Sequence, residues 1–239
     1  MKDYADRLID WMQKVVREAG AKGVVFGMSG GLDSSVVAVL GKKAFPQNSL
    51  GLIMPCYSHA EDEEHARMVS DAFDIPFQVI VLDDLLDLFM SKFGRQEDYQ
   101  DSELAVANIK PRLRMICLYY HAARRGYLVA GSSNRSEISA GYFTKYGDNA
   151  VDFMPLANLV KGQVRELAKE LGVPQEIIEK PPSGGLWPGQ TDEGEMGVTY
   201  DDIDNYLLKD SGDKRTREII EKMIKDSEHK KKMPPVPDF

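Results

Sequence analysis

The chain has 239 residues, 43% hydrophobic and 28% charged, with a formal net charge of −8. This composition is typical of a globular protein with a substantial core, and the acidic balance disfavours general nucleic-acid binding, which depends on basic surface. The apolar runs are far shorter than a membrane span, and the N-terminus is acidic where a secretory signal is basic and then apolar, so we expect a cytoplasmic protein with no membrane partner.

The first predicted element is an amphipathic helix over residues 4–19, with Leu8, Met12 and Val15 on one face and Gly20 as its end. It is followed by a strand over residues 24–26. These residues are all apolar, which is typical of a central parallel strand covered on both faces.

Residues 24–35 read VVFGMSGGLDSS, which combines this strand with a glycine turn and the start of a helix. Gly27, Gly30 and Gly31 allow positive φ and a close approach of the backbone to a ligand. Backbone N–H groups at the start of the following helix favour an anion. The pattern therefore predicts a phosphate cradle, although it matches neither GxxxxGK[ST] nor GxGxxG. The alternative is a glycine-rich turn without a ligand.

Further strands are predicted at residues 50–54, 77–82 and 127–131, with helices at 60–73, 85–93 and 104–125 between them. A capping box at residues 58–61 starts the first of these helices, Asp83 or Asp84 caps the second, and Pro111 breaks or restarts the third. Strands separated by such helices pair in parallel with right-handed crossovers. We therefore expect an α/β fold: a doubly wound parallel sheet of about five strands flanked by helices, as a single domain over residues 1–239.

The C-terminal part is predicted to be a helical extension, with helices at residues 164–171, 177–178, 200–208 and 217–224. Residues 180–199 are rich in glycine and proline and too long for a plain connector, which indicates either a lid or a disordered insert. If it is a lid, we expect Trp187 to cover bound substrate.

Cysteine and histidine give no sign of a metal or disulfide site. Cys56 and Cys117 are too few and too isolated for a disulfide framework, a zinc site or a CxxC pair, so we expect free thiols. His59, His65 and His121 lie on helical stretches without a second ligand three or four residues away, so we do not expect them to bind metal.

The string SGGLDS, residues 29–34, resembles the SGGxDS signature of the ATP pyrophosphatase (PP-loop) superfamily. Residues 131–174, 181–193, 197–207 and 229–235 are similar to the corresponding blocks of ammonia-dependent NAD⁺ synthetase. This resemblance implies an adenine nucleotide alpha hydrolase-like fold. It also implies the last step of NAD⁺ biosynthesis, in which ATP and deamido-NAD⁺ give an acyl-adenylate and pyrophosphate, and ammonia then displaces AMP.

The resemblance also implies site residues on the ATP side. Mg²⁺ is assigned to Asp33 and Glu137, whose carboxylates are the hard oxygen ligands that this ion requires. Ser132 stands where the family usually has threonine. The residues implied in ATP binding are Gly27, Met28, Ser29, Gly30, Gly31, Leu32, Asp33, Ser34, Ser132, Lys161 and Ser183.

On the other side of the reaction, the resemblance implies deamido-NAD⁺ contacts, for which cationic side chains suit the pyrophosphate. Pro111 stands where a small residue is expected, next to one of them. Asp148 is the hypothetical acceptor of a proton at the ammonia step. The implied contacts with deamido-NAD⁺ are Arg112, Lys145, Asp152, His229 and Lys230.

Family members work as homodimers with the dinucleotide at the subunit interface, and we expect the same here. No glutamine-hydrolysing domain fits before Val24, so we expect free ammonia or ammonia from another protein. One alternative is another PP-loop ligase or a tRNA-modifying adenylating enzyme, which the missing CxxC pair and the acidic charge disfavour. A second is a nucleotide-binding sensor without turnover, which Asp33 and Glu137 disfavour.

Overall fold

The structure is a computed structural model, which describes residues 1–93, 102–185 and 189–239. Four parallel strands form one sheet in the order β3-β2-β1-β4. They are β1 (Gly23–Gly27), β2 (Ser49–Ile53), β3 (Phe77–Val79) and β4 (Tyr127–Val129).

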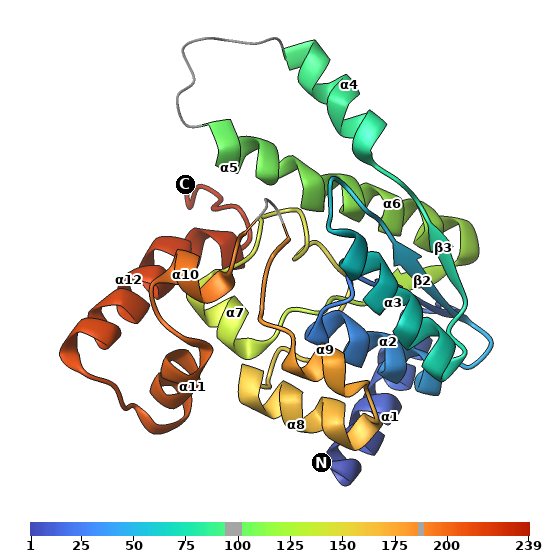
Figure 1. Cartoon of the computed structure of the whole chain (residues 1–239), viewed down its shortest axis with the longest axis horizontal. Coiled ribbons are helices and arrows are strands. Elements are labelled where there is room, and N and C mark those ends of the chain that lie inside the picture. Colours follow the sequence, from blue (N-terminus) through green and yellow to red (C-terminus); the bar gives the residue numbers. More distant parts are fainter. Residues whose placement is uncertain (94–101, 186–188) are drawn as a thin grey trace.

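Helices cover both faces of this sheet, and further helices lie beside it (Figure 1). They are α1 (Lys2–Glu18), α2 (Leu32–Ala44), α3 (Ala60–Phe73), α4 (Asp83–Phe93), α5 (Ser102–Ala107), α6 (Ile109–Arg125), α7 (Arg135–Ala140), α8 (Lys161–Leu171), α9 (Gln175–Glu179), α10 (Asp192–Met196), α11 (Tyr200–Lys209) and α12 (Lys214–Lys231).

The alternation of side chains along β1 explains how two layers of helices pack on one sheet. Val24 and Phe26 belong to the core beneath α1, α2, α3 and α8, whereas Val25 belongs to the core beneath α4 and α6. All three side chains are completely buried. Because the strand is covered on both faces, none of its side chains faces water, and its sequence is continuously apolar. The predicted doubly wound α/β fold is confirmed.

Within the described residues the sheet has four strands, one fewer than the approximate number expected. Beyond β4, Phe153 pairs with Ala130 only as an isolated parallel bridge. The third predicted strand is also shorter than expected, because β3 ends at Val79. The backbone N–H groups of Ile80 and Leu82 still donate to the carbonyls of Ile53, the last residue of β2, and of Pro55, at 2.9 and 2.8 Å, so the chain follows the sheet edge after its regular pairing ends.

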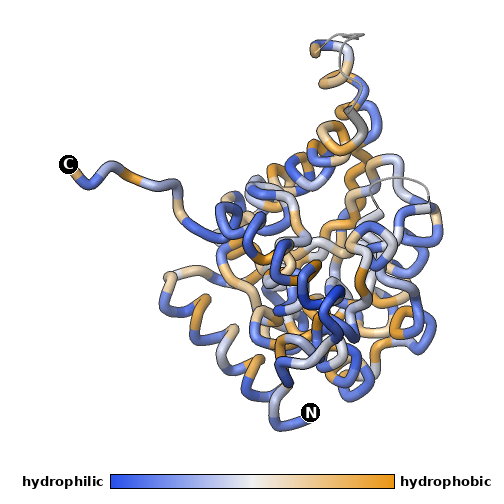
Figure 2. Tube along the Cα trace, turned by 90° about the vertical axis from the view of Figure 1, so that its left-hand side faces the viewer, coloured by the Kyte–Doolittle hydropathy of each residue, from blue (hydrophilic) through white to orange (hydrophobic). Residues whose placement is uncertain are grey.

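Helices α7, α10, α11 and α12 form a third cluster beside the sheet, with Tyr200, Ile203 and Ile220 buried at its centre. The predicted C-terminal helices at residues 200–208 and 217–224 belong to this cluster as α11 and α12, whereas those at 164–171 and 177–178, α8 and α9, pack in the core that contains Val24 and Phe26. Beyond α12 the last residues extend away from the body (Figure 2). In the described part of the chain, no helix combines the length and the apolar character that crossing a membrane requires.

Three local details differ from the sequence-based expectation. The capping box at residues 58–61 is wrong: α3 starts after His59, and the Ser58 hydroxyl instead accepts hydrogen bonds from Cys56 N–H and from Arg114, both at 3.2 Å. Asp83 is the first residue of α4 rather than its cap, and its carboxylate accepts from the N–H of Tyr57.

The third detail is the break near Pro111, which occurs earlier than expected. Helix α5 ends at Ala107 and α6 begins at Ile109, so Pro111 lies in the first turn of α6. The N–H groups of a first turn have no partner within the helix, so proline costs little there.

The strand order creates a switch point beside β1. After β1 the chain proceeds outward through β2 and β3, and then crosses to the opposite side of β1 to form β4. Loops that leave the carboxyl ends of β1 and β4 therefore diverge to different faces of the sheet. In open α/β sheets ligands bind in the crevice that such a divergence leaves.

Candidate active site

The loop between β1 and α2 is built around Gly30, which has φ +73°. A Cβ atom at this position would lie 2.2 Å from the carbonyl oxygen of Asp62 on α3, so only glycine allows this close packing. The hydroxyls of Ser34 and Ser35 donate to the carbonyl of Gly31, at 3.0 and 2.7 Å. No side chain of the described residues caps α2, so its first-turn N–H groups are available to an anion.

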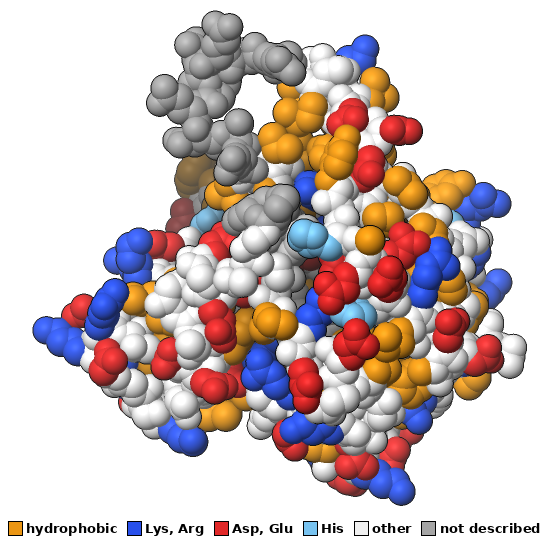
Figure 3. Space-filling view, viewed as in Figure 1, with side chains coloured by type: hydrophobic (Ala, Val, Ile, Leu, Met, Phe, Trp, Pro, Cys, Tyr) orange, Lys and Arg blue, Asp and Glu red, His pale blue; other side chains and the backbone are white. Residues whose placement is uncertain are grey.

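A cavity of about 800 Å³ lies at the carboxyl ends of the strands, between the sheet and the third helical cluster. Figure 3 shows this hollow near the centre of the molecule, with acidic and basic side chains at its rim. Gly30 itself lies outside the lining, packed against α3. The lining includes Gly27, Met28, Ser29, Gly31, Leu32, Asp33, Ser34, Ser132, Glu137, Asp148, Lys161, Ser183 and Lys230 from the predicted set.

Three charged side chains from different elements meet in this cavity. The ammonium group of Lys161, at the start of α8, bonds to a carboxylate oxygen of Asp33 and lies 3.1 Å from Oε1 of Glu137. It also lies 4.7 Å from the centre of the Tyr200 ring. Only 4% of the Lys161 side chain is exposed, so the ion pairs are shielded from water.

For Glu137 and for Lys161, burial and the charge of the ion-pair partner shift the pKa in opposite directions. Burial raises the pKa of Glu137 to about 7, although the neighbouring Lys161 opposes the shift. Burial alone would lower the pKa of Lys161, but Asp33 and Glu137 outweigh it and the pKa of the ammonium group is raised. Lys161 is therefore a permanent positive charge, whereas Glu137 can exchange a proton near neutral pH.

Asn134 connects the two carboxylate residues, and the sequence analysis missed it. Its side-chain amide donates to Oδ1 of Asp33 at 2.9 Å, and its side-chain oxygen accepts from the N–H of Glu137 at 3.0 Å. Its own N–H donates to Oε2 of Glu137 at 3.2 Å. The sequence did contain a signal for Asn134. An asparagine three residues before a glutamate can form a capping box, and Asn134 and Glu137 form one at the start of α7.

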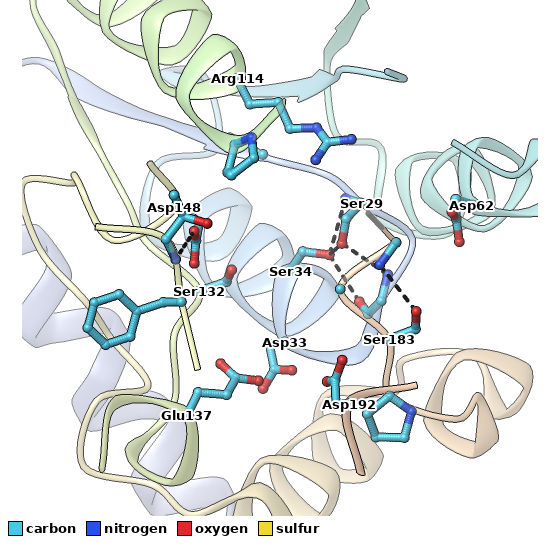
Figure 4. A pocket seen from close by; sticks show the side chains of 18 of the residues that line it. Ser29, Asp33, Ser34, Asp62, Arg114, Ser132, Glu137, Asp148, Ser183 and Asp192 are labelled. Atoms are coloured by element: carbon cyan, nitrogen blue, oxygen red, sulfur yellow. Dashed lines mark hydrogen bonds between the residues drawn. The ribbon is translucent and has the colours of Figure 1, made fainter. Parts of the chain in front are cut away.

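The donor set fits a divalent cation. Asp33 and Glu137 present oxygen atoms to one point, where the Lys161 ammonium group stands in for a cation. Nearby, Asp192 is 5% exposed and accepts from the Tyr200 hydroxyl at 2.9 Å, while its Oδ1 has no hydrogen-bond partner among the described residues. Figure 4 shows Asp33, Glu137 and Asp192 together at one end of the cavity.

Within the described residues, no three His, Cys, Asp or Glu side chains are placed as a complete metal site. Two carboxylates leave most positions of an octahedral ion to other oxygen ligands, which phosphate groups and water supply in nucleotide sites. The arrangement therefore suits an ion that binds together with a nucleotide.

Another part of the cavity holds Asp148 and Arg114 (Figure 4). The Asp148 carboxylate opens into the cavity and accepts from the N–H of Thr144 at 2.9 Å. The surrounding protein raises its pKa by desolvation, while the Thr144 hydrogen bond and the charge of Arg114 oppose this. Arg114, another residue that the sequence analysis missed, donates to the Met54 carbonyl at 3.0 Å.

Of the five residues expected to contact the dinucleotide, only Lys230 lines the cavity. Arg112, Lys145 and His229 form a chain beside it: Arg112 donates to the Lys145 carbonyl at 3.2 Å, and the Lys145 ammonium group to the His229 carbonyl at 2.9 Å. Asp152 accepts from the N–H of Val129 at 2.7 Å and so braces β4.

Lys230 reaches back from α12 into the same molecule. Its ammonium group donates to the carbonyls of Gly141 and Phe143, at 3.0 and 3.1 Å. The end of α12 therefore closes one side of the cavity within the chain itself.

A polar network connects the predicted lid segment to α3. Lys180 donates to Asp62 at 2.8 Å and contacts His65 at 2.9 Å, and the opposite ring nitrogen of His65 lies 3.1 Å from Glu176. The Ser183 hydroxyl donates to the Gln190 carbonyl at 2.8 Å. Trp187 lies outside the described residues, and the lid itself stays a prediction.

Comparison with known proteins gives a consistent result. A family model described as NAD synthase matches residues 4–234. The NH(3)-dependent NAD(+) synthetase of Carboxydothermus hydrogenoformans is 50% identical over 236 residues, which cover 99% of this chain and 97% of that protein.

Two solved structures match the whole fold. NMN synthetase from Francisella tularensis has a TM-score of 0.95 and 37% identity, covering 100% of this chain and 98% of that one. The NH3-dependent NAD synthetase from Campylobacter jejuni has a TM-score of 0.81 and 29% identity, covering 99% and 98%.

Proposed function

The chain belongs to the NAD synthase family and is a ligase that makes NAD⁺ from deamido-NAD⁺, ATP and ammonia; on that premise we propose that all three substrates meet in the cavity at the switch point of the sheet. The observation that carries this proposal is the convergence of the phosphate loop, Asp33, Glu137 and Lys161 on one cavity.

ATP occupies the end of the cavity beneath α2. The first-turn N–H groups of α2 and the hydroxyl of Ser29 hold phosphate oxygens, because these residues line the cavity and no side chain caps the helix among the described residues. Lys161 and Ser183 reach the phosphates from the opposite wall. Ser132, at the end of β4, offers a further hydroxyl to the nucleotide.

Asp33 and Glu137 would hold Mg²⁺ when the nucleotide is bound. The bound ion would supply positive charge where a carboxylate approaches the α-phosphate. Asn134 orients both carboxylates, and Lys161 adds a positive charge beside the phosphates.

The pyridine carboxylate is activated before nitrogen enters. One of its oxygens bonds to the α-phosphorus as the bond to the bridging oxygen breaks and pyrophosphate leaves. Ammonia then bonds to the carbonyl carbon, AMP leaves with the carboxylate oxygen, and the nitrogen loses a proton as the amide forms. Asp148 takes a proton from ammonium before this attack, a role that its position in the cavity and its raised pKa support.

The test is an assay with ATP, Mg²⁺, ammonium and deamido-NAD⁺ that follows NAD⁺, AMP and pyrophosphate. We expect the three products in equal amounts and strongly reduced rates in Asp33→Asn and Glu137→Gln. Asp148→Asn is expected to lose rate most at limiting ammonium. Normal amide formation by Asp148→Asn at limiting ammonium contradicts its role, and ATP binding without AMP formation favours a sensor.

A second substrate is suggested by the likeness to an NMN synthetase over the whole chain. Nicotinate mononucleotide carries the same pyridine carboxylate and lacks only the AMP half of deamido-NAD⁺, so the activation chemistry is unchanged. The discriminating measurement is kcat/KM for the two acids under identical conditions. A higher value for the mononucleotide identifies it as the preferred substrate. Arg112→Ala is expected to impair only deamido-NAD⁺ use if this side chain contacts the AMP half.

We also propose a homodimer formed through the face that α4, α5 and α6 present to solvent. Helix α4 buries only Leu86, and large hydrophobic side chains are exposed along all three helices. Figure 3 shows them gathered over α4. Such a surface is typical of a protein interface. The exposed residues are Leu85, Leu88, Phe89, Phe93, Leu104, Ile116 and Tyr120.

Sedimentation analysis tests this interface. The wild type is expected to sediment as a dimer, and Leu88→Glu with Phe89→Glu as a monomer. Leu208→Glu, at a residue that is 48% exposed on α11, is the matched control and should stay dimeric. A monomeric wild type, or a double variant that stays dimeric, contradicts the proposed interface.

A further inference from the structure

Asp204 on α11 is a buried acidic residue that does not line the cavity, yet it contacts two of the segments that do. It is 8% exposed. Its Oδ1 accepts from the hydroxyl of Ser136 at 2.5 Å and from the N–H of Lys161 at 3.3 Å. Its Oδ2 accepts from the N–H of Gly162 at 2.8 Å.

These contacts provide hydrogen-bond acceptors for the first N–H groups of α8. The residue before the helix is Val160, whose side chain cannot accept a hydrogen bond, so the first N–H groups of α8 need an acceptor from elsewhere. Asp204 supplies it from another helix, and its negative charge is favourable at a helix N-terminus. The first turn of α8 is therefore fixed to α11.

The same carboxylate fixes the start of α7. Ser136 directly precedes Glu137, and its hydroxyl, besides donating to Asp204, accepts from the N–H of Lys161 at 3.1 Å. Ser136 and Lys161 are thus bonded to each other and to one shared acceptor. A shift of either segment disturbs both contacts.

We propose that Asp204 is a positioning residue for the ligase reaction, which sets the distance between Glu137 on α7 and Lys161 on α8. This inference rests on the function proposed above for those two residues. Without Asp204 the backbones of both segments relax, and the carboxylate and the ammonium group no longer meet at one point with Asp33. Metal and ATP binding suffer, whereas the binding of the dinucleotide does not depend on this contact.

The first experiment compares Asp204→Ala with Asp213→Ala. Asp213 is an aspartate at the start of α12, where it accepts from the N–H of Thr216 at 2.9 Å, so it is a matched helix-capping control. We measure Mn²⁺ binding by electron paramagnetic resonance in the presence of ATP, and KM for MgATP and for deamido-NAD⁺. Asp204→Ala should weaken Mn²⁺ binding and raise KM for MgATP about tenfold, with KM for deamido-NAD⁺ unchanged. Asp213→Ala should leave all three values unchanged.

The proposal is overturned if Asp204→Ala binds Mn²⁺ and MgATP like the wild type, or if it loses affinity for every ligand equally. Ser136→Ala and Asp204→Asn decide the matter if Asp204→Ala does not fold. Ser136→Ala should show the same selective loss to a smaller extent, and Asp204→Asn, which keeps an acceptor for Gly162, should be intermediate. Wild-type values in both overturn the proposal.

Asp33→Asn, measured in parallel, separates this inference from the proposed function. If Asp33→Asn loses Mn²⁺ binding and the Asp204 variants do not, only the positioning role is wrong. If Asp33→Asn binds Mn²⁺ normally, the proposed metal site and the positioning role are both wrong.

Discussion

At the scale of single residues, Asn134 is a neutral side chain that connects the carboxylate pair, because it is bonded to Asp33 and to Glu137. Asn134→Ala removes the donor that orients Asp33. Loss of such an orienting partner typically costs ten- to a hundredfold in metal affinity, so we expect Mn²⁺ binding to weaken at least about tenfold. Titration calorimetry measures this, with Asn205→Ala on the exposed side of α11 as the control. Unchanged binding in Asn134→Ala contradicts the orienting role.

Glu137 gives a prediction for pH. Burial raises its pKa from 4.5 to about 7, so between these values the folded state binds more protons than the unfolded state. The contribution of this group to the free energy of unfolding therefore falls as pH rises from about 4.5 to 7. Glu137→Gln is expected to flatten the pH dependence of stability in this range, measured by urea unfolding without metal. If the free energy of unfolding of Glu137→Gln depends on pH as steeply as that of the wild type, the raised pKa of Glu137 is contradicted.

The cavity residues that were predicted from the sequence are those that stand in a recognisable local motif. Asp33 and Ser34 belong to one short loop, and Glu137 and Lys161 each stand within a block similar to the family. Asp204 also lies in such a block, at residues 197–207, but its role, like that of Arg114, depends on which distant segments lie beside it. Arg114 meets the end of β2, and Asp204 meets α7 and α8.

At the scale of elements, the packing of the phosphate loop on α3 yields a further prediction. Gly30→Ala is destabilised for two reasons. The φ angle of +73° is unfavourable for alanine, and the new methyl group would overlap the Asp62 carbonyl oxygen. Gly20→Ala, after α1, has a similar φ of +68° but no atom within 4 Å of the new methyl group.

The backbone conformation alone costs about 1 to 2 kcal/mol, which is the loss of stability expected for Gly20→Ala. Gly30→Ala should lose clearly more in chemical unfolding and should also bind ATP more weakly, because the loop or α3 must move. If both variants lose the same stability and bind ATP equally well, the loop does not depend on its contact with α3.

The elements that the sequence predicted best are those whose pattern reflects burial on defined faces. Strand β1 is continuously apolar, and α8 ends at Gly172 as expected. The predictions failed where polar groups had several possible partners. The Ser58 hydroxyl could cap α3 or serve Arg114, and local sequence does not decide between them. The edge strand β3 was predicted too long, because apolar residues continue along the sheet edge after the regular pairing ends.

At the scale of the whole molecule, the part of the cavity proposed to bind ATP combines loops from both sides of the switch point, and the part proposed to bind the dinucleotide depends on the C-terminal helix α12. Lys145 is bonded to His229, although 84 residues separate them in the sequence. No local pattern specifies this pairing, which results from the packing of α12 against α7. The parallel fold was predictable from alternating strands and helices, but the closure of the cavity by α12 was not.

The ion pairs of Lys161 affect the stability of the protein when no metal or nucleotide is bound. Because a side chain already compensates Asp33 and Glu137, folding requires no metal, and chelation by EDTA should leave the melting temperature unchanged. Lys161→Met leaves buried negative charges without compensation, which typically costs about 3 to 5 kcal/mol, and added Mg²⁺ should then restore part of the lost stability. A wild type that melts earlier in EDTA contradicts this. On the function proposed above, the protein would fold without magnesium and would need the ion only when ATP is bound for the reaction.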